Sequence, residues 1–270
     1  MIDMHVHLFP PAVFRAIWRH FESESKGMWR IHYKLSAERH MATLRAEGVR
    51  RFTTLVYAHK AGLARQLNDY VHQLSLAHAD VLPFGTVFAG DNNVSQEGRR
   101  IFEELGFFGL KLHPFVSREN IDEPKFFPLY ELMEAKGKVL VCHPGSGPVY
   151  DEPDGASRLE RVLQQFPRLR VVVAHCGAYE YGDYESLADK YEHVHFDTAM
   201  NCVHGSVFRD NCPGRLFFER HASRIVFGTD FPNIPYEYVR QTDAIRNLAL
   251  GPELEQRIFR GNAEALLGLP

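Results

Sequence analysis

Short apolar runs alternate with longer segments of helical periodicity along the whole chain. Leu159, Val162 and Leu163 form one such helical stripe, which ends before Pro167. The apolar runs carry Val, Ile, Leu and Phe at odd and even positions alike, as in parallel strands that are buried on both faces. The pattern predicts eight strands, at Ile2–Leu8, Val49–Ala58, Val81–Ala89, Phe108–Pro114, Lys138–Pro144, Leu169–Gly177, Val194–Ala199 and Arg224–Pro232.

Eight strands that alternate with helices in 270 residues indicate an α/β protein of the (β/α)8 TIM-barrel type, with one domain over residues 1–270. The alternative is an open doubly wound sheet, which usually has a glycine-rich turn after its first strand. Here the first strand continues into Leu8-Phe9-Pro10-Pro11. The barrel is therefore the favoured fold.

Individual residues predict where two of the helices begin or end. Ser36 is a candidate N-cap for a helix that ends at Gly48, and Gly137 is a candidate left-handed end for another helix. The segment from Phe9 to Lys34 is longer than a usual connection and carries Trp18 and Trp29. Long connections in compact domains are often lids or binding loops.

Composition narrows the class of protein. Lys and Arg number 31 against 34 Asp and Glu, and no basic run indicates a nucleic-acid partner. No apolar run reaches the roughly 18 residues of a membrane span. The four cysteines form no C-x-x-C pair, and the N-terminus shows no export signal, so a cytoplasmic protein with reduced thiols is expected. The 15 histidines are the unusual feature, since histidine is the commonest metal ligand and general base.

Polar residues gather at the carboxyl ends of the predicted strands, where barrel enzymes keep their active sites. Because strand side chains alternate, Asp3, His5 and His7 are expected to point together into the barrel. The other residues of this set end strands four, five, six and eight: Lys111 and His113, His143, His175, and Asp230.

Two imidazoles on one strand, a third across the barrel and one carboxylate suit Zn²⁺, with Mn²⁺, Fe²⁺ or Co²⁺ as alternatives. Three or four protein ligands with an open position describe a catalytic site. Such a metal would acidify a bound water and polarise a substrate carbonyl. Asp230 could both bind the ion and accept the proton of that water, and His175 is a candidate general acid or base.

Five segments, in this order along the chain, resemble the amidohydrolase superfamily: His5-Val6-His7, Gly109-Leu110-Lys111-Leu112-His113-Pro114, Cys142-His143-Pro144-Gly145, Ala174-His175-Cys176-Gly177 and Phe227-Gly228-Thr229-Asp230-Phe231-Pro232. The closest branch is the amidohydrolase-related group, which includes hydrolases, lactonases and non-oxidative decarboxylases similar to aminocarboxymuconate-semialdehyde decarboxylase. The resemblance implies that His5, His7, His143 and Asp230 bind one divalent metal, usually zinc. It also implies that His175 is the catalytic or substrate-polarising histidine.

Lys111 has two interpretations. In binuclear members a carboxylated lysine on the fourth strand bridges two metals, whereas a plain ammonium would pair with Asp230 or with a substrate carboxylate. The ammonium is favoured, because the related branch is usually mononuclear. His113 and Arg118 are the other candidate substrate-binding residues, and the guanidinium of Arg118 could hold a carboxylate.

Three functions follow from this site. The first is a metal-dependent hydrolase acting on an amide, lactone or ester of a small, carboxylated molecule. The second is a metal-dependent carboxy-lyase of a small unsaturated or aromatic acid, which would use the same ligands. The third is a barrel that binds metal without catalysis. A small-molecule substrate is the expected partner, with neither nucleic acid nor membrane, and a homodimer is an option for assembly.

Overall fold

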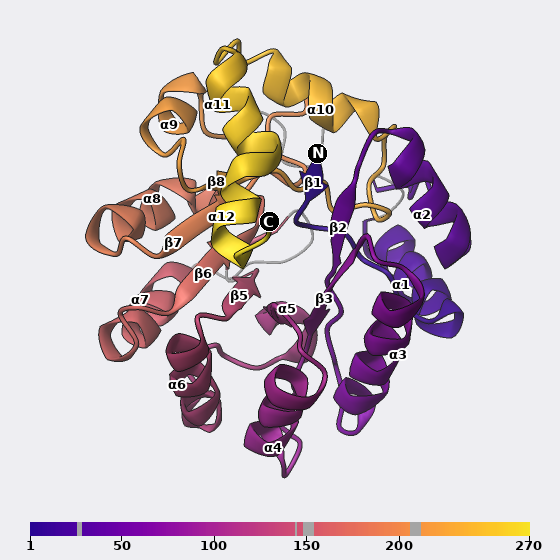
Figure 1. Ribbon diagram of the computed structural model, residues 1–270, viewed down its shortest axis with the longest axis vertical. Coiled ribbons are helices and arrows are strands. Elements are labelled where there is room, and N and C mark those ends of the chain that lie inside the picture. Colours follow the sequence, from indigo (N-terminus) through magenta and orange to yellow (C-terminus); the bar gives the residue numbers. More distant parts are fainter. Residues whose placement is uncertain (26–28, 144, 148–153, 206–211) are drawn as a thin grey trace.

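The computed structural model describes residues 1–25, 29–143, 145–147, 154–205 and 212–270. Within these residues eight parallel strands pair in sequence order, each with the next along the chain, and the helices lie around them (Figure 1). The strands are β1 (Ile2–Asp3), β2 (Arg51–Thr54), β3 (Val81–Gly85), β4 (Gly109–Leu112), β5 (Val139–Cys142), β6 (Arg170–Val173), β7 (Val194–Asp197) and β8 (Ile225–Val226).

Backbone hydrogen bonds between the first and last strand segments close the sheet. The amide of Met4 donates to the carbonyl of Phe227 (2.8 Å), and the amide of Asp230 donates to the carbonyl of His5 (2.8 Å). Further along, Val6 and Phe231 form a parallel bridge. These contacts close the sheet into the barrel that the sequence pattern predicted.

The strands are shorter than predicted, because pairing covers only part of each apolar run. The second strand was expected over Val49–Ala58, for example, but pairs only over Arg51–Thr54. The residues beyond the paired segment continue as buried loop and form the rim of the barrel. Pro144, the expected end of the fifth strand, lies outside the described residues.

The helices are α1 (Pro11–Glu24), α2 (Ala37–Ala46), α3 (Leu63–Ala77), α4 (Val94–Arg99), α5 (Pro114–Ser117), α6 (Phe127–Lys136), α7 (Gly155–Gln165), α8 (Tyr181–Lys190), α9 (Arg215–Arg220), α10 (Val239–Arg246), α11 (Pro252–Gln256) and α12 (Asn262–Leu267). Ser36 caps α2 by accepting a hydrogen bond from the amide of Arg39. Gly137 ends α6 in the left-handed conformation (φ 61°). Both predicted ends are thus confirmed.

Two apolar layers hold the barrel together. One fills its interior and is built from alternate strand residues: Ile2, Met4, Leu82, Phe84, Val139, Val141, Val172 and Val226. The other lies between the strands and the surrounding helices and includes Leu110, Leu140, Val171 and Phe196. Two-residue alternation along each strand separates the layers, as expected for strands that are buried on both faces.

The C-terminal helix α12 closes one end of the barrel. Its Ala263 and Leu266 join the interior apolar layer, and the amide group of Asn262 donates to the carbonyls of Ala222 and Ile225. Arg170, at the start of β6, donates to the carbonyl of Leu266 (3.1 Å). The amino-terminal end is therefore covered, and polar side chains collect at the carboxyl end. Within the described chain, no helix combines the length and apolarity needed to cross a bilayer.

Candidate metal centre

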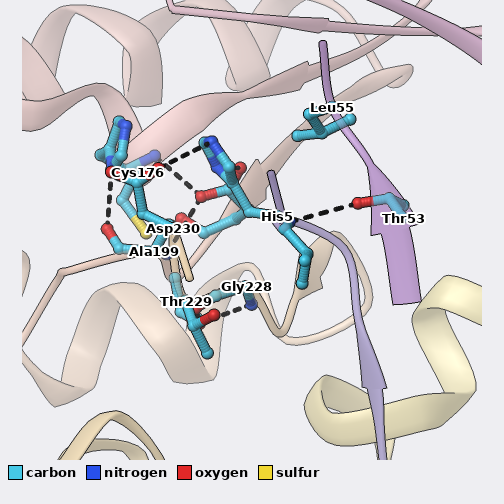
Figure 2. Close-up of polar contacts among 12 residues, drawn as sticks. His5, Thr53, Leu55, Cys176, Ala199, Gly228, Thr229 and Asp230 are labelled. Atoms are coloured by element: carbon cyan, nitrogen blue, oxygen red, sulfur yellow. Dashed lines mark hydrogen bonds and ion pairs between the residues drawn. The ribbon is translucent and has the colours of Figure 1, made fainter. Parts of the chain in front are cut away.

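The side chains of His5, His7 and Asp230 converge at the carboxyl end of the barrel. One ligand atom from each lies within 4.8 Å of the others, and all three residues are buried. Nε2 of His7 is 2.7 Å from Oδ1 of Asp230, and Nε2 of His5 is 3.7 Å from the same oxygen. Figure 2 shows His5 and Asp230 together, with Thr53 and Leu55 on the neighbouring strand segment.

The hydrogen bonds of the two imidazoles set which nitrogen faces Asp230. Nδ1 of His7 lies 2.5 Å from the carbonyl of Leu55, and Nδ1 of His5 lies 2.8 Å from Oδ2 of Asp197. A carbonyl and a carboxylate only accept, so each Nδ1 carries the proton. In the neutral rings both Nε2 lone pairs then point toward the Asp230 carboxylate.

Two lone pairs and a carboxylate facing one another repel unless a cation or a proton lies between them. Ligand atoms around a tetrahedral zinc ion lie roughly 3.3 Å apart. The observed separations of 2.7 and 3.7 Å lie on either side of that value. The donor set therefore fits a divalent ion with only small movements of the side chains.

The backbone at Asp230 brings its carboxylate toward the histidines. Asp230 has a left-handed conformation (φ 68°), which a short polar residue adopts more readily than most others. Burial by itself would raise the pKa of this carboxyl group. The nearby imidazole of His7, together with those of His5 and His175, reverses that effect and holds the pKa well below its usual range.

Asp197, at the end of β7, supports this centre in a way that the sequence analysis missed. Its Oδ2 accepts from His5, and its Oδ1 accepts from the backbone amides of His175 (2.9 Å) and Ala199 (3.0 Å). Burial raises its pKa, but the His5 imidazole outweighs burial and lowers it to about 2. Asp197 was not among the predicted site residues, although His195 and Asp197 show the same two-residue spacing that singled out Lys111 and His113.

A glycine makes this contact between β1 and β7 feasible. A Cβ atom added to Gly228 would lie 2.8 Å from Cβ of His5 and 3.3 Å from Cβ of Asp197. Any larger residue at 228 would push these two side chains apart. Gly228 belongs to the motif that ends in Asp230, so one turn supplies both a ligand and the space beside it.

His175 follows β6 in an unusual turn, in which His175, Cys176 and Gly177 all have positive φ. Its Nδ1 lies 2.9 Å from the carbonyl of Ala199, which makes Nδ1 the protonated nitrogen. The side-chain amide of Asn201 donates to the carbonyl of His175. Burial lowers the pKa of His175. The ring is therefore a fixed neutral imidazole in the same pocket as His5.

Six rings form a closed circuit around the pocket. Successive centroids are 5.1 Å apart for His7 and His5, 4.9 Å for His5 and His175, 4.5 Å for His175 and His143, 4.6 Å for His143 and His113, 5.1 Å for His113 and Tyr57, and 5.6 Å for Tyr57 and His7. Lys111 and Asp230 line the same pocket.

The structure brings most of the predicted site residues together. His143 and His113 line the pocket, with their rings nearly parallel (15°), but His143 lies outside the compact group of His5, His7 and Asp230. Lys111 also lines the pocket, and no carboxylate of the described residues lies within 4 Å of its Nζ. Arg118 is not a lining residue. It ends α5 in a left-handed conformation, so its placement gives no support to the predicted substrate contact.

The expected orientation of Asp3 is wrong. Its carboxylate accepts hydrogen bonds from Thr229 (2.7 Å) and Tyr238 (2.9 Å), on the side of α10, and does not line the pocket. The backbone bends at Met4, which interrupts the strand alternation between Asp3 and His5. His5 and His7 remain on one side because the bend comes before them.

The long connection after β1 covers the pocket, as expected of a lid or binding loop. It contains α1, whose Phe21 lines the pocket, and Trp29, whose indole N–H donates to the carbonyl of Asn233 (2.7 Å). Trp29 and Asn233 are lining residues too, whereas Trp18 is not. The indole bond ties this segment to the turn that follows Asp230.

A model of the amidohydrolase family matches residues 2–269. The chain belongs to the amidohydrolase family. This amidohydrolase is 32% identical over 84 residues to 2-amino-3-carboxymuconate-6-semialdehyde decarboxylase of Dictyostelium discoideum, an aligned stretch that spans 30% of this chain and only 23% of that relative.

Two solved structures share the fold of the amidohydrolase. An uncharacterized TIM-barrel protein, Bb4693 of Bordetella bronchiseptica, superimposes with a TM-score of 0.76 at 20% identity, covering 99% of both chains. 5-Carboxyvanillate decarboxylase LigW of Sphingomonas paucimobilis superimposes with a TM-score of 0.71 at 19% identity, covering 100% of this chain and 99% of that one. Because the identities are only 20% and 19%, these two similarities show a shared barrel fold and nothing about the reaction. The superfamily is metal-dependent, in agreement with the His and Asp cluster.

Proposed function

We propose that this amidohydrolase is a metal-dependent carboxy-lyase that removes CO₂ from a small unsaturated or aromatic acid. The observation that carries the proposal is the convergence of two imidazole lone pairs on Asp230, beside a buried lysine, in a pocket walled by aromatic rings. The names of similar proteins support the same choice, since both 2-amino-3-carboxymuconate-6-semialdehyde decarboxylase and 5-carboxyvanillate decarboxylase act on unsaturated acids. Hydrolysis, the first expectation from the sequence, is supported less well by these similarities.

The ion would be held by His5, His7 and Asp230, with His143, which lines the same pocket, as the proposed fourth ligand. A bound divalent ion supplies a Lewis-acid centre that orients and polarises the oxygens of a substrate. Zinc is the proposed metal because imidazole and carboxylate ligands suit it, with Mn²⁺, Fe²⁺ and Co²⁺ as alternatives. Asp197 fixes the tautomer of His5, so that Nε2 stays available as a ligand atom.

The chemical step breaks the bond between the carboxylate carbon and the neighbouring carbon. The electron pair of that bond stays on the substrate carbon, and one proton replaces the CO₂ that leaves. His175 is the proposed proton donor. The N–H at its Nδ1 donates to the carbonyl of Ala199. The proton for the substrate would therefore be carried on Nε2, on the opposite side of the ring. The ring must first take that proton; burial opposes this and lowers the pKa of His175, whereas the carboxylates of Asp230 and Asp197 favour it. Asp230 is the second candidate donor.

The test is a reaction screen of small unsaturated and aromatic acids with metal-loaded protein in ²H₂O and in ¹⁸O-labelled water. A carboxy-lyase releases CO₂ and places one deuterium on the product carbon, with no ¹⁸O in the organic product. A product that carries ¹⁸O without CO₂ release would instead show a hydrolase. Asp230→Asn is the matched inactive control, because Asn is among the residues that tolerate the left-handed conformation found at 230.

A further inference from the structure

Lys111 is a buried lysine with no hydrogen-bond or ion-pair partner among the described residues. It lies on β4 with 1% of its surface exposed, and it lines the pocket. Its Nζ makes no hydrogen bond to any described residue, and no carboxylate of those residues comes within 4 Å. An ammonium group buried without an anion is strongly unfavourable. Such a residue persists where a ligand completes its environment.

The two nearby carboxylates are already engaged elsewhere. Asp197 accepts from His5 through one oxygen and from two backbone amides through the other. Asp230 faces His5 and His7 and is the proposed carboxylate ligand of the ion. The two positive charges of a divalent ion would balance the negative charges of Asp197 and Asp230. No negative charge would then remain to compensate the Lys111 ammonium.

We propose that Lys111 binds a second carboxylate of the substrate, one that stays on the product. The substrate class is then a planar unsaturated or aromatic dicarboxylic acid. This inference rests on the proposed carboxy-lyase function. The carboxylate that leaves as CO₂ loses its negative charge in the transition state, so pairing it with an ammonium would stabilise the ground state more and slow the reaction. An ammonium helps only on a carboxylate that keeps its charge.

The walls of the pocket agree with a flat substrate. The circuit of six rings lines the cavity together with Phe21 and Trp29. Conjugated carbon frameworks pack well on such surfaces. One carboxylate near the proposed ion and another at Lys111 would hold such a framework at both ends.

The test compares the binding of paired acids by calorimetry, without turnover. Zinc-loaded protein is titrated with isophthalate and benzoate, and with muconate and sorbate, so that each pair differs by one carboxylate. Each diacid should bind the wild type about ten-fold more tightly than its monoacid, which corresponds to roughly 1.4 kcal/mol. Lys111→Met should remove this preference, and Lys111→Arg should retain part of it. Lys190→Met, which removes an exposed charge on α8, is the control and should leave the preference unchanged.

The outcomes separate this inference from the proposed function. Equal affinities within both pairs in the wild type, or an unchanged preference in Lys111→Met, would overturn the role of Lys111. So would two ions per chain together with a mass increase of one CO₂ on Lys111, which would show a bridging carbamate. If Lys111→Met does not fold, Lys111→Gln is used in its place. A chain that binds diacids through Lys111 but releases no CO₂ would keep this inference and refute the carboxy-lyase.

Discussion

Oδ2 of Asp197 lies 2.8 Å from Nδ1 of His5, although 192 positions separate the two residues in the chain. The same carboxylate accepts two backbone amides through its other oxygen. A side chain that no sequence motif contains thus sets the tautomer of a proposed metal ligand.

Asp197→Asn should weaken metal binding by roughly 10- to 100-fold. Backbone amides only donate, so the Asn oxygen must take the position that faces His175 and Ala199. Its NH₂ group then faces Nδ1 of His5 and forces the ring proton onto Nε2, where it blocks the ion. Competition titration with a metal-binding dye measures the affinity, and ¹⁵N NMR of the histidine rings reports the tautomer. Asp189→Asn, on the surface of α8, is the control, and an unchanged His5 tautomer in Asp197→Asn would disprove this role.

Asp230→Asn should abolish turnover while the fold is retained. The amide keeps the size and the left-handed backbone but loses the charge that faces His5 and His7, so the affinity for the ion should fall by on the order of 100-fold or more. Elemental analysis gives the metal content, and circular dichroism checks the fold. Full activity with a full complement of metal would remove Asp230 from the mechanism.

Gly228→Ala should destabilise the protein and displace His5 from Asp197. The added methyl group would lie 2.8 Å from Cβ of His5, and overpacking of this kind typically costs about 1–3 kcal/mol. Urea denaturation gives the free energy of unfolding, and metal content reports the site. Gly182→Ala is the control, because nothing lies within 4 Å of its added Cβ. Equal free energies of unfolding for Gly228→Ala and the wild type would contradict this prediction, because the backbone near His5 would then accommodate the methyl group without loss of stability.

Acid should destabilise the metal-free protein partly through His40. This ring packs on Phe14 (5.2 Å) and Phe231 (5.4 Å), and burial lowers its pKa from the usual 6.5 to about 4. The unfolded chain therefore binds the proton first. The stabilising contribution of neutral His40 is complete above pH 6.5 and is lost as the pH falls toward 4, by about 2–3 kcal/mol.

His40→Gln should flatten the pH dependence of the unfolding free energy between pH 6.5 and 4, whereas replacement of exposed His20 by Gln should not. Urea titrations at several pH values measure the slopes. Parallel slopes for wild type and His40→Gln would assign the acid sensitivity to other groups.

The arrangement of the site followed from the sequence because parallel strands put all their carboxyl ends on one rim. His5, His7, Lys111, His113 and His143 could be placed together without any distance information. The side chain of Asp3 could not, because alternation assumes a regular strand and the backbone bends at Met4. The turn at His175 also follows no periodic rule, since the four consecutive residues from His175 to Ala178 have positive φ.

One part of the pocket depends on a contact that local patterns do not encode. Trp29 reaches the site through a bond to Asn233, which is 204 positions away. The position of Asp197, in contrast, could have been predicted from the sequence. It ends a predicted strand and shares its spacing with His195, so the rule that selected Lys111 and His113 would have selected it too.

The bonds between the first and last strand segments also bear on how the protein is made. Thr229 and Asp3, which meet at this junction, are 226 positions apart. During synthesis the opening histidines leave the ribosome long before Asp230 exists, so the nascent chain has no complete cation-binding group until its final strand emerges. Binding of the proposed ion would therefore be a late event, and contacts at such separation favour slow folding.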